Sequence, residues 1–242
     1  MASQLNRPFA VFDIDGTVIR WQLYHAISDA LAQKGAINKQ SFEAVKTARM
    51  DWKRRSGEES FREYEQALVR VFEQELKDLD VNDLSVAADQ VFYEYKDQVY
   101  TYTRDLIRTL KAKNYLLFAI SGSPDIIVGK LAKYYGFDDF AASSYEIRDN
   151  HFTGAIDLSI GKKAALLKGL IDKHRASISG SIAVADGEGD IDMLNMVEQP
   201  IVFNPSKQLI NYATKKNWPI VIERKNVIYK LSYVDYEYRL TL

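Results

Sequence analysis

The chain has 242 residues, of which 47% are hydrophobic and 27% charged, and it contains no cysteine. This composition is typical of a globular protein with a sizeable core, and it excludes disulfides, thiolate catalysis and cysteine metal sites. The formal net charge of -1 creates no overall field that would attract nucleic acid or a membrane surface.

The opening residues, MASQLNRPF, lack the charged and apolar segments of a secretory signal. The longest apolar run in the interior, residues 115–120, is far too short to span a bilayer. We therefore expect a cytoplasmic protein, a monomer or homodimer, without a nucleic-acid or membrane partner.

Taken in chain order, the first element is an apolar run, Phe9–Ile14, that predicts a buried strand. Asp13 and Asp15 stand at its carboxyl end, and residues two apart in an extended chain lie on one face. Two carboxylates this close repel each other unless a cation lies between them or one is protonated. The pair therefore indicates a cation site or a shared proton, and a plain Asp-Gly turn is the alternative.

A helical stretch follows, from Trp21 to Tyr100, with no proline and two glycines. Apolar residues recur at spacings of three and four, as in an amphipathic helix. A stretch of about 80 residues is too long for an ordinary connection and predicts an inserted helical domain. The predicted helices cover residues 21–34, 41–55, 58–76 and 84–99.

From residue 101 onward, predicted helices and strands alternate, which favours an α/β fold with a doubly wound, mostly parallel, Rossmann-like sheet. Residues 1–20 and 101–242 then form the core, and 21–100 the inserted all-helical domain. The tyrosine-rich tail, 225–242, receives no assignment. Predicted strands cover 115–120, 140–145, 182–185, 201–203 and 220–222, a hairpin covers 146–157, and helices cover 104–113, 124–135, 163–174, 190–196 and 207–215.

Two later turns also carry chemically useful groups where a strand ends. Ser121 and Gly122 precede Ser123, which can cap a helix, and Pro124, which suits a first helical position. The free N–H groups of such a helix start can bind an anion. An ordinary, well-capped turn is the alternative.

The other turn holds the carboxylates of Asp186, Glu188 and Asp190, which suit Mg²⁺, a hard cation that prefers oxygen ligands. An acid-rich helix start is the alternative. Lys162 and Lys163 open a helix, where cations are normally unfavourable, so one of them would be explained by a nearby anion. A solvated lysine pair is the alternative. Together these groups indicate phosphoryl transfer with a carboxylate nucleophile and Mg²⁺.

Four stretches resemble, in order and spacing, the motifs of the haloacid dehalogenase (HAD) superfamily. The inserted helices resemble the C1-type cap of its phosphoserine-phosphatase-like branch, subfamily IB. The stretches are FDIDGT at 12–17, SGS at 121–123, GKK at 161–163 and DGEGD at 186–190.

The resemblance implies a role for each group. Asp13 would attack phosphorus to form an aspartyl-phosphate, and Asp15 would protonate the leaving oxygen and then activate water. Ser121, Gly122 and a lysine would hold the transferring phosphoryl group.

The metal ligands implied by the resemblance are Asp13, the backbone carbonyl of Asp15, and Asp186, with Asp190 supporting the site. Mg²⁺ would reduce the repulsion between Asp13 and an anionic substrate. Gly189 stands where the branch often has Asn or Ser, which removes one polar side chain near the metal.

The choice of lysine rests on helix phase and on the distance to the last motif. Counting from Lys163, apolar Leu167, Leu170 and Ile171 follow at four, seven and eight residues. Lys163 is therefore the predicted phosphate ligand, with Lys162 as the alternative.

Other residues bear on the choice of substrate. Gln22 replaces the glutamate that meets the substrate amine in phosphoserine phosphatases, which argues against phosphoserine. Arg20, Arg49 and the basic run 53–55 could meet a further anion, although a solvated helix face explains the run more simply.

We therefore expect a Mg²⁺-dependent phosphatase acting on a small phosphorylated metabolite. The alternatives are phosphoserine phosphatase specifically, a phosphotransferase in which an alcohol replaces water, and a non-catalytic module that binds phosphorylated metabolites.

Overall fold

The computed structural model describes residues 6–241, and the chain divides into two compact units. The first unit holds the described residues up to Gln22, then Glu94–Ser143, and the chain from Leu158 onward. The second holds Leu23–Tyr93 and Ser144–Asp157.

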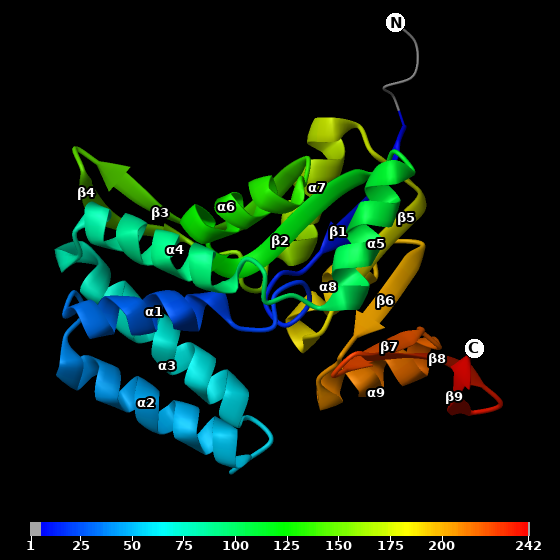
Figure 1. The fold of residues 1–242 in the computed structure, drawn as a ribbon, viewed down its shortest axis with the longest axis horizontal. Coiled ribbons are helices and arrows are strands. Elements are labelled where there is room, and N and C mark those ends of the chain that lie inside the picture. The colour runs from blue at the N-terminus through cyan, green and yellow to red at the C-terminus, as the bar shows by residue number, and fades with distance from the viewer. Residues whose placement is uncertain (1–5, 242) are drawn as a thin grey trace, which may run out of the picture. The chain divides into compact units, whose positions relative to one another are not determined.

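A mixed sheet runs through the fold in the order β4-β3-β2-β1-β5-β6-β7-β8-β9 (Figure 1). Pairing is parallel from β3 through β7 and antiparallel at both ends. The parallel strands are β1 (Pro8–Phe12), β2 (Leu116–Pro124), β3 (Asp139–Arg148), β5 (Ser177–Ala185), β6 (Gln199–Phe203) and β7 (Ile220–Arg224). The antiparallel strands are β4 (His151–Asp157), β8 (Val227–Val234) and β9 (Glu237–Thr241).

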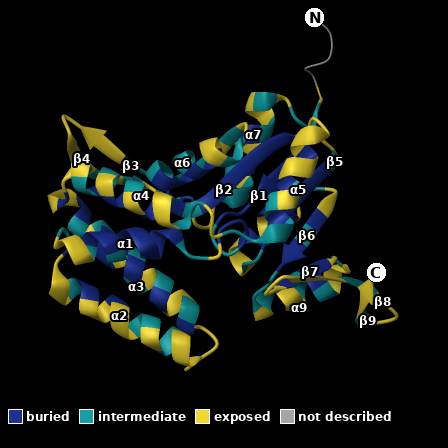
Figure 2. Ribbon diagram, in the orientation of Figure 1, coloured by how far each residue is buried: buried dark blue, intermediate teal, exposed yellow. Residues whose placement is uncertain are grey.

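Helices cover both faces of the central strands, which explains why β1 is apolar throughout rather than alternating. Phe9 and Val11 of β1 join a buried cluster with Leu167, Met193 and Leu209, which come from three helices. Figure 2 shows β1 and β2 dark blue, in agreement with their burial. The helices of the first unit are α5 (Thr101–Ala112), α6 (Asp125–Tyr135), α7 (Lys163–His174), the short 3-10 helix η2 (Glu188–Asp190), α8 (Ile191–Leu194) and α9 (Lys207–Lys216).

The inserted stretch is helical, and it begins and ends within a few residues of the predicted positions. Asn38 caps the second helix by accepting a hydrogen bond from the N–H of Gln40, which explains the predicted break there. The buried rings of Tyr64 and Phe72 form part of its core. The elements are α1 (Leu23–Lys34), α2 (Lys39–Arg54), α3 (Ser60–Glu75), the 3-10 helix η1 (Leu76–Asp78) and α4 (Val81–Tyr95).

The predicted fold class is confirmed: the protein is α/β, with a mostly parallel sheet flanked by helices. The unassigned tail forms β8 and β9, joined at Asp235 and Tyr236, which both have positive φ. The predicted hairpin is also present, with Asp149 and Asn150 at its turn. No helix among residues 6–241 is long and apolar enough to cross a membrane.

The units differ from the predicted domains in three segments. Residues 21–22 and 94–100, which the sequence places in the inserted domain, lie in the first unit. Residues Ser144–Asp157, which the sequence places in the core, group with the helices Leu23–Tyr93. One reason is local packing, because the ring of Tyr145 lies 5.4 Å from that of Phe72. The division into core and cap domain itself stays a prediction.

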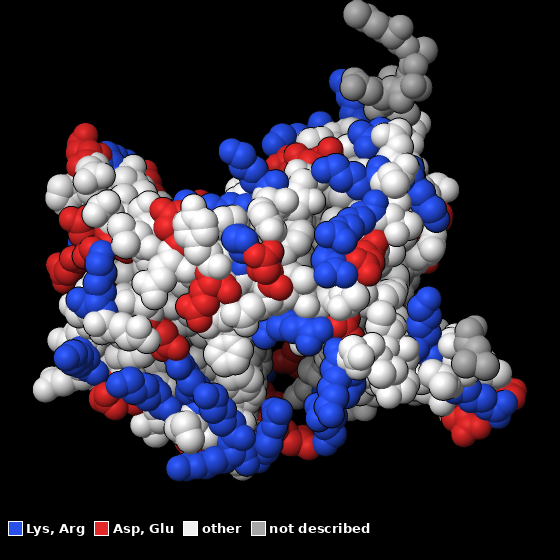
Figure 3. All heavy atoms as spheres, viewed as in Figure 1, with Lys and Arg blue, Asp and Glu red and all other residues white. Residues whose placement is uncertain are grey.

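Charged side chains of both signs are mixed over the face that Figure 3 shows. Lys and Arg are frequent along α2, from Lys39 to Arg54. Arg49 of this helix is held by Asp29 through two hydrogen bonds of 2.7 and 2.6 Å, and it also donates to the hydroxyl of Tyr64. Arg49 is thus already paired within the second unit.

Candidate active site

The turn after β1 is built around a glycine that cannot be replaced without strain. Gly16 has φ +82°, a conformation that L side chains rarely adopt. A Cβ at Gly16 would lie 2.3 Å from Oδ2 of Asp186. The N–H of Asp13 donates to the carbonyl of Val184, which joins this turn to β5. The two acidic turns therefore meet closely at the carboxyl ends of β1 and β5.

Three carboxylates and one ammonium group gather at this edge of the sheet. Ligand atoms of Asp13, Asp186 and Asp190 all lie within 4.8 Å of one another. Nζ of Lys163 lies 2.7 Å from Oδ1 of Asp13 and also donates to Asp190. Lys163 begins α7 and is largely buried, whereas Lys162 is exposed. The structure thus brings Lys163, rather than Lys162, to the carboxylates.

Burial makes these charges costly and shifts their titration. Burial raises the pKa of Asp13, against the opposing effect of Lys163. Burial, followed by the charges of Asp13 and Asp190, raises the pKa of Asp186 well above its usual range. Burial also raises the pKa of Asp190 to about 6. Burial alone would lower the pKa of Lys163, but the carboxylates raise it above its usual value.

This donor set fits a divalent cation. When ionised, the three carboxylates and one ammonium leave two negative charges in a small, mostly buried space. The available donors are oxygens only, which suits Mg²⁺. Such a charge excess is stable only if a cation or protons compensate it.

Asp15 lies in a separate set of contacts with the second turn. The hydroxyl of Ser121 donates to Oδ2 of Asp15 at 2.6 Å, and that of Ser123 donates to Oδ1 at 3.0 Å. The prediction that Ser123 caps α6 is wrong, since Pro124 is the N-cap residue and no side chain caps this helix end. Strand β2 continues to Pro124, so Ser123 is still part of the strand, and its hydroxyl donates to Asp15 instead.

Two buried serines that sequence analysis missed support the Ser121–Gly122 turn. Ser143 donates to the carbonyl of Gly122 at 2.8 Å, and Ser159 donates to the carbonyl of Ser121. Their hydroxyls lie 3.1 Å apart. Because these serine hydroxyls hold the two backbone carbonyls, the N–H groups of the turn keep a fixed direction. Single serines carry no recognisable sequence signal for such a role.

Thr17 is a further missed residue beside the carboxylates. Its hydroxyl donates to Oδ1 of Asp186 at 3.0 Å, and its carbonyl accepts from the hydroxyl of Thr103 at 2.9 Å. Both threonines are fully buried. Thr17 is part of the stretch FDIDGT, so its place next to the acidic pair could have suggested a contact with a carboxylate. No local sequence pattern identifies Thr103 as its partner.

Some acidic residues of the third turn lie outside this cluster. Glu188 and Asp192 are exposed. Asp190 is held by its own loop, since it accepts a hydrogen bond of 3.2 Å from the N–H of Gly187. The acid-rich turn is therefore partly a site and partly a solvated helix start.

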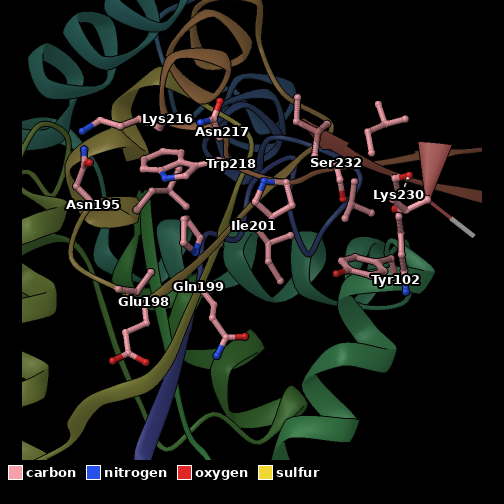
Figure 4. Close-up of a pocket in the computed structure, with 18 residues that line it drawn as sticks. Tyr102, Asn195, Glu198, Gln199, Ile201, Lys216, Asn217, Trp218, Lys230 and Ser232 are labelled. Atoms are coloured by element: carbon pink, nitrogen blue, oxygen red, sulfur yellow. Dashed lines mark hydrogen bonds between the residues drawn. The ribbon is translucent and has the colours of Figure 1, made fainter. Parts of the chain in front are cut away.

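A cavity of about 650 Å³ occupies a different part of the first unit (Figure 4). Its lining includes Tyr102, Ile201, Trp218 and Lys230, and it contains none of the clustered carboxylates. Gln199, at the amino end of β6, also lines it. Because the acidic cluster lies at the carboxyl ends of the strands, we do not assign the reaction to this cavity.

The model of the haloacid dehalogenase-like hydrolase family matches residues 10–195. This is more than half of the chain, and the protein therefore belongs to that family. The phosphoserine phosphatase of Streptomyces coelicolor is 34% identical over 104 residues, which is 42% of this chain and 25% of that protein. The phosphoserine phosphatase of Lactococcus lactis is 30% identical over 133 residues, 54% of this chain and 59% of that protein.

The chain thus covers less than two thirds of either relative. A longer match, at 22% identity, is to the histidinol-phosphatase of Neisseria meningitidis, over 88% of this chain and 97% of that protein. The predicted resemblance to the phosphoserine-phosphatase-like branch of the HAD superfamily is confirmed.

Solved structures support the same fold. A Bordetella pertussis protein of unknown function superposes with a TM-score of 0.72 at 19% identity, covering 90% of this chain and 99% of that one. A phospho-aspartyl intermediate analogue of phosphoserine phosphatase has a TM-score of 0.63 at 22% identity, covering 91% and 95% of the two chains. At these identities the likeness concerns the fold alone.

Proposed function

We propose that this protein is a Mg²⁺-dependent phosphatase that hydrolyses a small phosphorylated metabolite through an aspartyl-phosphate on Asp13. The observation that carries the proposal is the Lys163 ammonium held between the carboxylates of Asp13 and Asp190, with Asp186 alongside. An ammonium in this position can neutralise phosphate oxygens beside a carboxylate nucleophile. Membership of the hydrolase family supports the same chemistry.

The reaction would proceed in two displacements at phosphorus. A carboxylate oxygen of Asp13 forms a bond to phosphorus while the bond from phosphorus to the leaving oxygen breaks, and protonated Asp15 donates a proton to that oxygen. Asp15 then accepts a proton from water, whose oxygen attacks phosphorus and breaks the bond to Asp13. The contacts of Asp15 with Ser121 and Ser123 keep its carboxyl group in one orientation.

The phosphoryl group would be held by Ser121, Gly122 and Lys163. Gly122 has no side chain, and a Cβ there would crowd Ile160, one of whose side-chain carbons would lie 3.2 Å away, so a larger residue would disturb this turn. Ser143 and Ser159 fix the backbone of this turn. Backbone N–H groups fixed in this way are preorganised donors, which lower the barrier because they need no rearrangement during the reaction. The Ser121 hydroxyl would first have to leave Asp15, to which it donates.

Mg²⁺ would be held by Asp13, Asp186 and the backbone carbonyl of Asp15, with Asp190 supporting the site. When bound, it would supply charge neutralisation for the substrate and the transition state. Its removal would leave the carboxylates of the cluster facing an anionic ester.

For the substrate, we propose a small phosphate monoester, and we propose residues 21–100 as the cap domain of a core made of 1–20 and 101–242. Phosphoserine is the leading specific candidate by relatedness, and Gln22 in place of the family's glutamate argues for a substrate without that amine contact. Arg20 and Arg49 are weaker candidates for substrate binding, since each is held by a carboxylate of its own unit.

The test is phosphate release from a panel that includes phosphoserine, histidinol phosphate, other phosphorylated metabolites and an aryl phosphate. The reaction is run with Mg²⁺, with chelator, and with Asp13→Asn. We expect turnover that needs Mg²⁺ and is lost in the variant, because the amide cannot act as the nucleophile. The matched control is Asp192→Asn, an exposed neighbour of the cluster that should retain activity.

Other results would redirect the assignment. Transfer of phosphate to an added alcohol in preference to water would identify a phosphotransferase. Tight binding of esters without turnover would identify a binding module. Turnover that survives both chelator and Asp13→Asn would contradict the proposed chemistry.

A further inference from the structure

Glu223, on β7, is a buried carboxylate far along the chain from the family motifs. Its side chain is 1% exposed, and it lies beyond residues 10–195, to which the family model matches. A buried charge is costly unless it is paired and hydrogen-bonded. The groups that bind the Glu223 carboxylate are therefore the ones that it holds in place.

Glu223 binds the two segments by which the chain leaves and re-enters the first unit. One carboxylate oxygen accepts from the guanidinium of Arg20 and from the N–H of Thr101, the latter at 3.0 Å. The other oxygen accepts from the N–H of Tyr102 at 2.8 Å. The chain leaves this unit after Gln22 and returns at Glu94, so one carboxylate holds the chain close to both connections.

The two segments also bind each other, and we call residues 18–20 and 98–100 the linker ribbon. The N–H of Arg20 donates to Gln98 at 2.8 Å, and that of Tyr100 donates to Val18 at 3.1 Å. Ile19 and Val99 form an antiparallel bridge, and the Arg20 side chain donates to the Val99 carbonyl at 2.7 Å. The ribbon is therefore a small hydrogen-bonded unit anchored at Glu223.

From the ribbon, one short route leads to the acidic cluster. Thr103, in the helix that starts beside Glu223, donates to the carbonyl of Thr17, and Thr17 donates to Asp186. A second route starts at the N–H of Glu223, which donates to the side chain of Asn204 at 2.8 Å. Two residues later, the N–H of Ser206 donates to the carbonyl of Asp186 at 2.9 Å.

We propose that Glu223 is a positioning residue: by holding the linker ribbon and the start of α5, it keeps Thr17 and the Asp186 carboxylate in place for metal binding. The role rests on the proposed function, because Asp186 is a metal ligand in that proposal. A helix cap alone would explain the bonds to Thr101 and Tyr102, since α5 has no side-chain cap of its own. It would not explain the simultaneous bond to Arg20.

The experiment compares Glu223→Gln with the full-length wild-type protein. We measure the Mg²⁺ concentration for half-maximal phosphate release, kcat, KM for an aryl phosphate, and the unfolding temperature. Substitution of a residue that orients a metal ligand typically changes metal affinity or activity by about 10- to 100-fold. Glu223 is two steps further away, through Thr103 and Thr17, so we expect a smaller rise, of about 3- to 10-fold, in that Mg²⁺ concentration. KM at saturating Mg²⁺ should change little.

Two further variants separate positioning from simple stability. Glu237→Gln is the matched control, because Glu237 also binds an arginine, Arg239, but is exposed on β9. It should leave all four quantities unchanged. Thr103→Val removes the bond to the Thr17 carbonyl, together with a longer contact of 3.3 Å to the carbonyl of Tyr100, and it leaves both bonds from the start of α5 to Glu223 in place. It should reproduce the Mg²⁺ shift. Combined with Glu223→Gln, it should add less than the sum of the two effects, because both act through Thr17.

The proposal is overturned if Glu223→Gln lowers only the unfolding temperature, or if Thr103→Val leaves the Mg²⁺ dependence unchanged. If Glu223→Gln does not fold, Thr103→Val decides the matter by itself. If the wild-type protein releases no phosphate from any ester, the proposed function fails separately. Calorimetric titration with Mg²⁺ alone then measures the same affinity shift, and equal affinities in wild type and both variants reject the positioning role.

Discussion

Replacing Gly16 with alanine tests the geometry of the acidic cluster most directly. The added Cβ would lie 2.3 Å from Oδ2 of Asp186, whereas ordinary contacts begin near 3.4 Å. Either the Asp186 carboxylate or the turn must therefore move by about 1 Å, and a displacement of that size can lower a rate by about 100-fold. This corresponds to about 2.7 kcal/mol in the activation barrier.

The backbone makes a second contribution, which a matched variant can separate. Gly16 has φ +82°, and a left-handed conformation costs an alanine about 1–2 kcal/mol of stability. Gly35 has φ +79° with no atom within 4 Å of its Cβ position. Gly35→Ala should thus lose similar stability while retaining full activity.

The assay is phosphate release as a function of Mg²⁺, together with urea unfolding of both variants. We expect Gly16→Ala to need more Mg²⁺ and to turn over about 100-fold more slowly, beyond anything that its lost stability explains. Equal Mg²⁺ dependence and turnover in Gly16→Ala and wild type would refute the reasoning, as would a matching activity loss in Gly35→Ala.

Three more predictions concern single side chains. Lys163→Met should reduce phosphate release by at least about 100-fold, because an ammonium beside the developing phosphoryl charge is lost, whereas Lys162→Met should stay within a few-fold of wild type. Ser159→Ala should lower kcat by about 3- to 10-fold, since a hydrogen bond worth about 1 kcal/mol no longer fixes the Ser121 carbonyl; an unchanged kcat would argue against preorganisation of that turn. Burial, and secondarily the charge of Arg49, lowers the pKa of His25 from 6.5 to about 3. The unfolded chain therefore binds a proton that the folded chain does not between these pH values, so the stability from neutral His25 is complete above pH 6.5 and is lost as pH falls. In urea unfolding, wild type should lose about 1.4 kcal/mol per pH unit more than His25→Leu across that window, and parallel pH profiles would show that His25 is not buried as described.

The sequence is sufficient to predict most helices and strands before residue 225 and the chemistry of the main groups, whereas it gives no assignment to the tail that forms β8 and β9. The continuous apolar run before Asp13 predicts a strand buried on both faces, and β1 is such a strand. Helical periodicity predicts Lys163–His174 to the residue. Such signals are local: a buried strand or a helix face requires apolar residues at fixed spacings, whatever lies around it. The acidic motifs likewise predict a cation site, because closely spaced carboxylates are costly without a compensating charge.

Only the tertiary structure decides which of these groups meet, and which unremarkable residues hold them. Ser159, Thr103 and Glu223 are common residue types with no pattern around them, yet each donates to or accepts from a backbone group next to the site or its linkers. Their partners lie 38, 86 and 122 positions away in the sequence. Ser123 shows that a local pattern can also predict the wrong partner. Its sequence context favours a helix cap, whereas its hydroxyl donates to Asp15. A hydrogen bond depends on the distance and angle between two groups, and for residues far apart in the chain only the packed fold sets both.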